Sequence, residues 1–125
     1  MRSHFISRIG KMQFQVAVED ISHFSAGDKY VTAFHRDGQL LLDEPLKSLE
    51  QEFGTAFTRI HRSHLVRTTL VSNFRWQTYA ASIRVHGTNH RLPVSRACAA
   101  TIKLLASQHQ GEFRSAALAP LQASA

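Results

Sequence analysis

The β-rich character of this chain is decided by residues 30–42, which read YVTAFHRDGQLLL. Asp37-Gly38 is a strong signal for a hairpin turn, because glycine adopts the backbone conformation that a tight two-residue turn requires. Residues 30–35 before it are rich in β-branched and aromatic side chains, and residues 40–42 supply the returning strand. We therefore expect an antiparallel hairpin here.

The strand pattern continues on both sides of this hairpin. Residues 12–16 alternate apolar and polar positions, and residues 21–25 form a further β-rich run before the turn at residues 26–29. Toward the C-terminus, residues 70–76 and 81–86 read as an antiparallel pair joined around Gln77-Thr78-Tyr79. A turn at residues 87–89 then leads into a short strand at residues 91–94.

Two helices and one helical turn are expected between these strands. Pro45 fits the first turn of a helix that Asp43 or Glu44 caps and that Gly54 ends. Ser95 is placed to cap a second helix, and Ser63 a single helical turn through residues 65–66. The core-facing residues of the two helices are predicted from their spacing: Leu46, Leu49 and Phe53 in the first, and Cys98, Ile102 and Leu105 in the second. The fold class is therefore mainly β with two or three short helices.

The 125 residues suffice for one domain with its own hydrophobic core. We expect a leader or linker at residues 1–11, the domain at residues 12–107 and a flexible tail at residues 108–125. No apolar run is long enough for a membrane span or a signal peptide, so a cytoplasmic location without membrane contact is expected. The single cysteine, Cys98, cannot form an internal disulfide.

Charge is distributed unevenly along the sequence. The formal net charge is +6, but eight of the nine acidic residues lie between Glu19 and Glu52. Residues 53–111 contain no Asp or Glu and eight cations, of which seven are arginine. Cations without nearby acids favour a polyanion such as the phosphate backbone of DNA, and the planar guanidinium binds phosphate or guanine with two parallel hydrogen bonds.

Three segments place polar side chains suited to nucleic acid at strand ends or at a helix start. They are residues 27–30 at a hairpin tip, residues 59–66, and residues 92–96. In the third segment, Ser95 begins a helix whose backbone amides can hold a phosphate, while Arg96 is free to reach outward. Together they predict contacts with nucleic acid from well-separated parts of the chain.

The order and spacing of these motifs resemble the LytTR family over residues 12–107. The resemblance rests on Tyr30-Val31, Asp37-Gly38, Pro45-Leu46-Lys47-Ser48-Leu49-Glu50, Phe57-x-Arg59-Ile60-His61-Arg62-Ser63-x-Leu65-Val66 and Leu92-Pro93-Val94-Ser95-Arg96. Asp43-Glu44-Pro45-Leu46-Lys47 and the last motif are most similar to the branch that contains the alginate regulator. The sequence departs from the family at Arg67, where many members have Asn, and at His64, an aromatic position.

The resemblance implies short antiparallel sheets whose loops enter the major groove of double-stranded DNA, as in the output domain of a bacterial response regulator. Family members usually bind direct repeats, often as homodimers, behind an N-terminal receiver domain. No receiver domain is present in this sequence, so we expect a fragment or a stand-alone regulator. The base-reading residues carried over by position are Lys29, Tyr30, Arg62 and Arg96. Residues expected to contact phosphates are Arg59, Ser63, Arg67, Arg75, Arg91, Ser95 and Lys103. For Arg59 and Arg84, a structural ion pair or a solvated position is an equal alternative.

Competing functions are less well supported by the residues. His61 with His64, or His86 with His90, would be the first metal ligands to consider. Residues three apart in an extended segment point to opposite faces, however, and nearby acids are missing, so no metal or cofactor is expected. His61 is instead expected to bond to backbone and position the turn that bears Arg62.

Catalysis is not expected either. Neither Ser63 nor Ser95 has a nearby acid or a glycine-rich elbow, and a nuclease would need clustered carboxylates for Mg²⁺. The remaining alternative is a non-catalytic protein-interaction or dimerisation module that uses Phe74, Trp76 and Tyr79, for which core packing is the simpler expectation.

Overall fold

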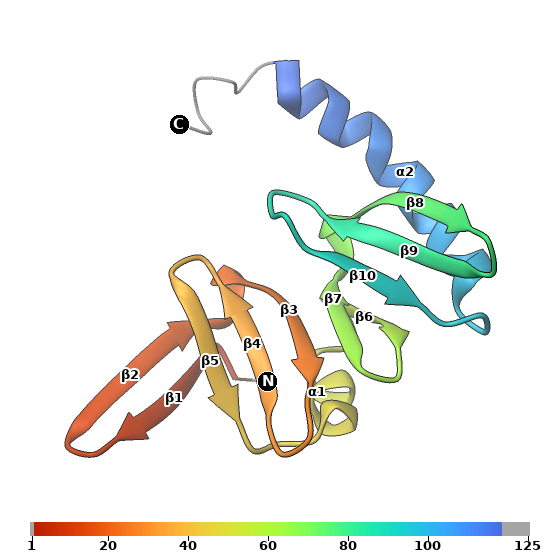
Figure 1. The fold of residues 1–125 in the computed structure, drawn as a ribbon. Coiled ribbons are helices and arrows are strands. Elements are labelled where there is room, and N and C mark those ends of the chain that lie inside the picture. Colours follow the sequence, from red (N-terminus) through yellow and green to blue (C-terminus); the bar gives the residue numbers. More distant parts are fainter. Residues whose placement is uncertain (1, 119–125) are drawn as a thin grey trace. The chain divides into compact units, whose positions relative to one another are not determined.

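Two antiparallel sheets and one short helix form the first part of the chain (Figure 1). The computed structural model describes residues 2–118, with the side chains of all of these except residues 7–9 and 110–118. A two-stranded sheet pairs β1 (His4–Ile9) with β2 (Met12–Ala17). A five-stranded sheet has the order β5-β4-β3-β7-β6. Its strands are β3 (Ile21–Ala26), β4 (Val31–His35), β5 (Gly38–Leu42), β6 (Phe57–His61) and β7 (His64–Arg67). The helix α1 (Leu46–Phe53) connects β5 to β6, and short 3-10 helices, η1 (Val18–Asp20) and η2 (Thr68–Leu70), flank β3 and β7 in the sequence.

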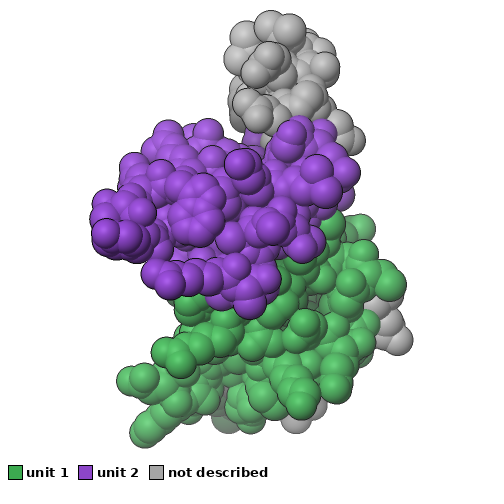
Figure 2. Space-filling model, turned by 90° about the vertical axis from the view of Figure 1, so that its right-hand side faces the viewer, with its two compact units in different colours: residues 1–68 green, residues 69–125 purple. Residues whose placement is uncertain are grey.

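The chain divides into two compact units, residues 1–68 and residues 69–125, which Figure 2 shows in green and purple. We call them the N-terminal unit and the C-terminal unit and describe each by itself. The sequence suggests a single domain over residues 12–107, because hydrophobic patterning marks strands and helices but does not show which of them share a core.

The predicted hairpin is the centre of the N-terminal unit. Its register pairs His35 with Gly38, and Gly38 has φ 146°, a conformation that side chains other than glycine rarely adopt. Val31 and Ala33 of β4 point into the core, so the strand alternation is confirmed. The largest buried side chains of this core are phenylalanines, of which Phe24 and Phe57 pack with ring centroids 5.1 Å apart.

Helix α1 covers this core with the predicted residues. Leu46, Leu49 and Phe53 are all buried, as their helical spacing indicates. The capping prediction is wrong, because Pro45 occupies the N-cap position and no side chain caps the helix. Glu44 is instead engaged by an arginine from the start of the chain, as described below.

Two segments differ from the sequence-based expectation. Residues 4–9 form strand β1 and not a leader, because Phe5 is buried in the core against the rings of Phe24 (5.9 Å) and Phe53 (5.7 Å). The helical turn expected after Ser63 is wrong, because residues 64–67 form strand β7. This strand hydrogen-bonds to β3 on one side and to β6 on the other, which a helical turn could not do.

The C-terminal unit is a three-stranded antiparallel sheet with one long helix. The sheet has the order β10-β9-β8, with β8 (Val71–Gln77), β9 (Ala80–Val85) and β10 (Arg91–Val94). These strands and their turns follow the sequence prediction. The helix α2 (Ala99–Leu118) packs on β8. Its core side contains Ala99, Ile102 and Ala106, while Cys98, in the preceding turn, and Leu105 are half-buried.

Helix α2 differs from the prediction at both ends. It begins at Ala99 and not directly after Ser95, since residues 96–98 form a turn in which the Cys98 amide donates to the Ser95 carbonyl at 3.0 Å. It continues to Leu118, within the segment expected to be a flexible tail, and residues 119–125 lie outside the described residues. Neither α2 nor α1 is long and apolar enough to cross a membrane. The fold class is confirmed as mainly β with short antiparallel sheets and two α-helices, the second longer than expected.

Candidate nucleic-acid interface

An open groove of about 410 Å³ lies at one end of the five-stranded sheet in the N-terminal unit. Its walls are the β3–β4 turn (residues 26–31), the β5–α1 connection (residues 43–47), Arg59 and Arg62. Three of the four predicted base-reading residues, Lys29, Tyr30 and Arg62, therefore line the same groove. All three are exposed, with 51% of Tyr30 accessible to solvent. The sheet thus brings together side chains that are about 30 residues apart in the sequence.

Backbone hydrogen bonds join the two turns that carry these side chains. The β3–β4 turn is closed by the Gly27 amide, which donates to the Tyr30 carbonyl at 2.8 Å. The Ala26 amide donates to the Ser63 carbonyl at 2.8 Å, which ties this turn to the β6–β7 turn. Beside that bond, Ser25 Oγ and His64 Nδ1 are 2.8 Å apart. The spacing between the Lys29-Tyr30 tip and Arg62 is therefore set by the sheet.

The backbone of the β6–β7 turn is held by two neighbouring side chains. The Ser63 amide donates to His61 Nδ1 at 3.1 Å, so the prediction that His61 bonds to backbone at this turn is confirmed. Arg59 donates from Nε to the His61 carbonyl (2.8 Å) and from Nη2 to the Arg62 carbonyl (2.6 Å). Its Nη1 contacts the carboxylate of Glu50 at 2.7 Å. These bonds fix the backbone of the turn and leave the Arg62 side chain exposed.

Arg67 also directs its hydrogen bonds into the protein. It donates from Nε to the Ile21 carbonyl at 2.9 Å and from Nη2 to the Val18 carbonyl. Its guanidinium lies 4.6 Å from the centre of the Phe57 ring, and partial burial lowers the pKa of Arg67. Arg59 and Arg67, both predicted as phosphate contacts, therefore hold the fold with the same donors that a phosphate would need.

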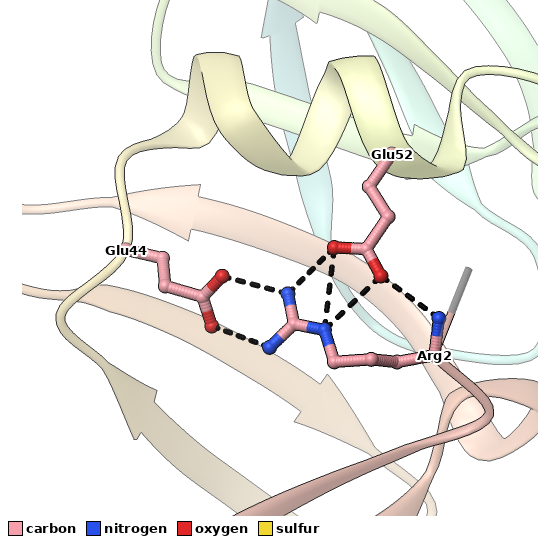
Figure 3. A network of polar contacts seen from close by, with 3 residues as sticks. All are labelled: Arg2, Glu44 and Glu52. Carbon is pink, nitrogen blue, oxygen red and sulfur yellow. Dashed lines mark hydrogen bonds and ion pairs between the residues drawn. The ribbon is translucent and has the colours of Figure 1, made fainter.

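Arg2 neutralises one acidic side chain of the groove wall (Figure 3). Its guanidinium binds Glu44 at 2.6 Å and Glu52 at 2.7 Å, and it lies 4.6 Å from the centre of the Phe5 ring. Pairing raises the pKa of Arg2 and lowers the pKa of the Glu52 carboxyl. Sequence reasoning missed Arg2, since its partners are 42 and 50 residues away and nothing in residues 1–5 indicates them.

The remaining predicted contacts lie in the C-terminal unit. Arg96 is exposed in the turn before α2, Ser95 is half-buried just before that turn, and Lys103 is exposed on α2. Arg91 donates to Ser82 Oγ at 3.0 Å and to Asn73, while Arg75 is exposed on β8. Whether these residues act together with the groove of the N-terminal unit stays a prediction.

The histidines and exposed aromatic residues differ from the sequence-based expectation in two places. The rings of His61 and His64 face each other across the β6–β7 turn, with centroids 5.4 Å apart, so the argument that placed them on opposite faces is wrong. Among the described residues, no group of three His, Cys, Asp or Glu could hold a metal ion. Trp76 is 51% exposed and Tyr79 78% exposed, so core packing is wrong for both, whereas Phe74 is half-buried.

Comparisons with known proteins identify the family and the fold. The family model of the LytTr DNA-binding domain matches residues 11–107. The positive alginate biosynthesis regulatory protein of Pseudomonas aeruginosa is 51% identical over 65 residues, which is 52% of this chain and 26% of that protein's length. A solved LytTr DNA-binding domain from Bacillus cereus aligns with a TM-score of 0.70 and 19% identity, over 84% of this chain and 97% of the other. The match to the family model over most of the chain shows that it belongs to the LytTR family of DNA-binding domains.

Proposed function

We propose that this domain reads the sequence of double-stranded DNA with loops placed in the major groove, as part of a bacterial transcription regulator. The observation that carries the proposal is the groove at the end of the five-stranded sheet, where the Lys29-Tyr30 tip and Arg62 are presented together on a fixed backbone. Arg62 and Arg96 each have the donor geometry to bind O6 and N7 of a guanine, which contributes about 1–3 kcal/mol of discrimination per base pair.

The roles of the other predicted contacts follow from their surroundings. Ser63 in the β6–β7 turn, Ser95 just before the turn that precedes α2, and Lys103 on α2 remain candidates for phosphate contacts, together with Arg75 and Arg91. We assign Arg59 and Arg67 instead to positioning, because their donors are engaged within the protein and acids offset their charges, Glu50 for Arg59 and Glu19 and Asp20 for Arg67. Arg91 also donates within the protein, but its neighbouring charges are cations. Base contacts would set sequence preference, and phosphate contacts would set affinity and its dependence on salt.

The similarity to the alginate regulatory protein extends this proposal to the whole regulator. That protein is named as a positive regulator, and the matched region is about a quarter of its length. We expect this domain likewise to act without catalysis in the cytoplasm, to bind direct repeats and to form homodimers on them, either as a fragment of a regulator with a receiver domain or as a stand-alone regulator. The exposed Trp76 and Tyr79 favour a second role for the C-terminal unit in protein contacts, of which a homodimer is the simplest.

Selection of bound sequences from a random duplex pool, followed by mobility-shift titrations of the selected and scrambled duplexes, tests the proposal. Wild-type protein should enrich a defined sequence, and Arg62→Ala should lose preference at one position of it. Arg36→Ala is the matched control, because the Arg36 side chain is 78% exposed in the β4–β5 turn, at the other end of β4 from the groove. If no sequence is enriched and neither duplex is shifted, the protein-interaction alternative is favoured.

A further inference from the structure

Three arginines lie on one face of the sheet in the C-terminal unit. Arg91 of β10 is directly opposite Arg84 of β9, and Arg75 of β8 is opposite Ser82, two residues before Arg84. Directly paired residues of antiparallel strands point to the same side, so the three side chains share a face. The other face of β9 carries the buried residues Ala81, Ile83 and Val85. We call the side with Arg75, Arg84 and Arg91 the arginine face.

Arg91 is held in a fixed orientation by a β-bulge. The register of β8 and β9 shifts between Ser72 and Arg75, and Asn73 within this bulge has φ 51°. Arg91 donates to the Asn73 carbonyl at 3.2 Å, to Asn73 Oδ1, and to Ser82 Oγ at 3.0 Å. Bulges commonly redirect side chains, and here the bulge supplies the acceptors for Arg91. Arg91 has therefore already lost part of its side-chain conformational entropy before any ligand binds.

The positive charges of this face form no ion pair in the part of the chain that the structure describes. Residues 53–111 contain no Asp or Glu. Arg84 donates from Nε to the Thr88 carbonyl at 3.1 Å, which is a neutral acceptor. Partial burial lowers the pKa of Arg91, and the charges of Arg75 and Arg84 lower it further. The free protein therefore contains a repulsive cluster that a bound anion would relieve.

We propose that the arginine face is a second DNA-contacting surface, which binds backbone phosphates without reading bases and has Arg84 as its central residue. The inference rests on the proposed function and deepens it, because it adds to the recognition loops a sheet surface that sets affinity. Closely spaced guanidinium groups match the closely spaced charges of a duplex, which carries one phosphate per about 1.7 Å of helix axis. An arginine face on strands, with no side chain at a loop tip, is suited to phosphate contact and unsuited to reading base edges.

The experiment compares Arg75→Gln, Arg84→Gln and the double variant with wild type, using selected and scrambled duplexes at several salt concentrations. Each substitution should weaken binding to both duplexes equally. It should also make the slope of the logarithm of the binding constant against log salt shallower by about 0.9. At about 0.1 M salt the double variant should bind at least about tenfold more weakly than wild type. Urea unfolding of the free protein should show unchanged or higher stability, because neutralisation removes repulsion. Arg36→Gln is the control for net charge.

The outcomes separate this proposal from the proposed function. If wild type selects its sequence but the double variant has the affinity and salt slope of Arg36→Gln, the arginine face does not bind phosphate. A loss of discrimination restricted to one base pair of the selected sequence would also overturn the proposal, because it would mean that these arginines read bases. If affinity falls only in variants that are less stable, the arginines are structural. If wild type binds neither duplex, the proposed function fails, and this inference fails with it.

Discussion

Arg59 provides the sharpest test of how the groove of the N-terminal unit is built. Its three donors reach the His61 carbonyl, the Arg62 carbonyl and the Glu50 carboxylate, at 2.8, 2.6 and 2.7 Å. Arg59→Lys keeps the positive charge but removes the planar fork that makes three directed bonds at once. The substitution therefore separates a structural role, which needs the fork, from a phosphate contact, for which charge alone is largely sufficient.

The magnitude follows from the bonds that lysine cannot make. Hydrogen bonds that involve a charged group contribute about 1.5–3 kcal/mol each, and an ammonium at this position can keep about one of the three. Two lost bonds give about 3 kcal/mol at the lower limit. The Arg59 side chain is 25% exposed, so water replaces part of what is lost. We expect Arg59→Lys to lower the free energy of unfolding by about 2 kcal/mol.

Urea unfolding at neutral pH measures this loss, and mobility shifts at several salt concentrations measure its effect on DNA. The turn that carries Arg62 should become less ordered, so preference for the selected duplex should fall while the salt slope stays at the wild-type value. Arg36→Lys is the matched control, because the 78% exposed Arg36 forms only a 3.5 Å pair with Asp20. Unchanged stability in Arg59→Lys, combined with a shallower salt slope in Arg59→Gln, would refute this role and restore Arg59 as a phosphate contact.

Three further predictions concern Arg96, two histidines and Arg2. Arg96→Ala should lose about 1–3 kcal/mol of discrimination at one operator position, measured with duplexes that each carry a single-base change. If binding is instead weakened equally for all of these duplexes, Arg96 contacts a phosphate. Burial lowers the pKa of His64 and of His86 below the usual 6.5, so the unfolded chain binds protons more readily and stability should fall as the pH drops below about 6.5. Unfolding measured at pH 7.5 and 5.5 tests this, and His64→Gln should flatten the profile. Arg2→Gln should cost about 1 kcal/mol in urea unfolding and weaken binding to both duplexes, because Glu44 at the groove becomes unpaired; unchanged affinity would mean that the Glu44 charge does not reach the DNA.

Local chemistry explains which elements could be predicted from the sequence. The Asp37-Gly38 turn and the spacing of Leu46, Leu49 and Phe53 give the β4–β5 hairpin and α1, because their signals lie within a few residues. Strand β1 gave no such signal. It is fixed by the burial of Phe5 against rings 19 and 48 residues away, which no local pattern contains.

The same distinction applies to the candidate interface. The Lys29-Tyr30 tip and Arg62 were predicted from their motifs, and the sheet places them in one groove. The internal roles of Arg59 and Arg67 could not be predicted, because a guanidinium in a motif looks the same whether its acceptor is a phosphate or a carbonyl of the protein. For Arg67 the acceptors are the carbonyls of Ile21 and Val18, more than 40 residues earlier in the chain.

The distribution of ion pairs predicts different roles for the groove of the N-terminal unit and for the arginine face of the C-terminal unit. All the ion pairs within the described residues lie in the N-terminal unit, where acids neutralise Arg2, Arg36 and Arg59. The groove also contains Asp28 and Asp43, so we expect its attraction for phosphate in general to be weak and contact there to depend on matching base edges. The C-terminal unit has no acid before Glu112, so under the proposal above we expect Arg75, Arg84 and Arg91 to attract any duplex. Because electrostatic affinity does not depend on sequence and base contacts do, substitutions in the groove should change which DNA is bound, and substitutions on the arginine face should change how tightly any DNA is bound.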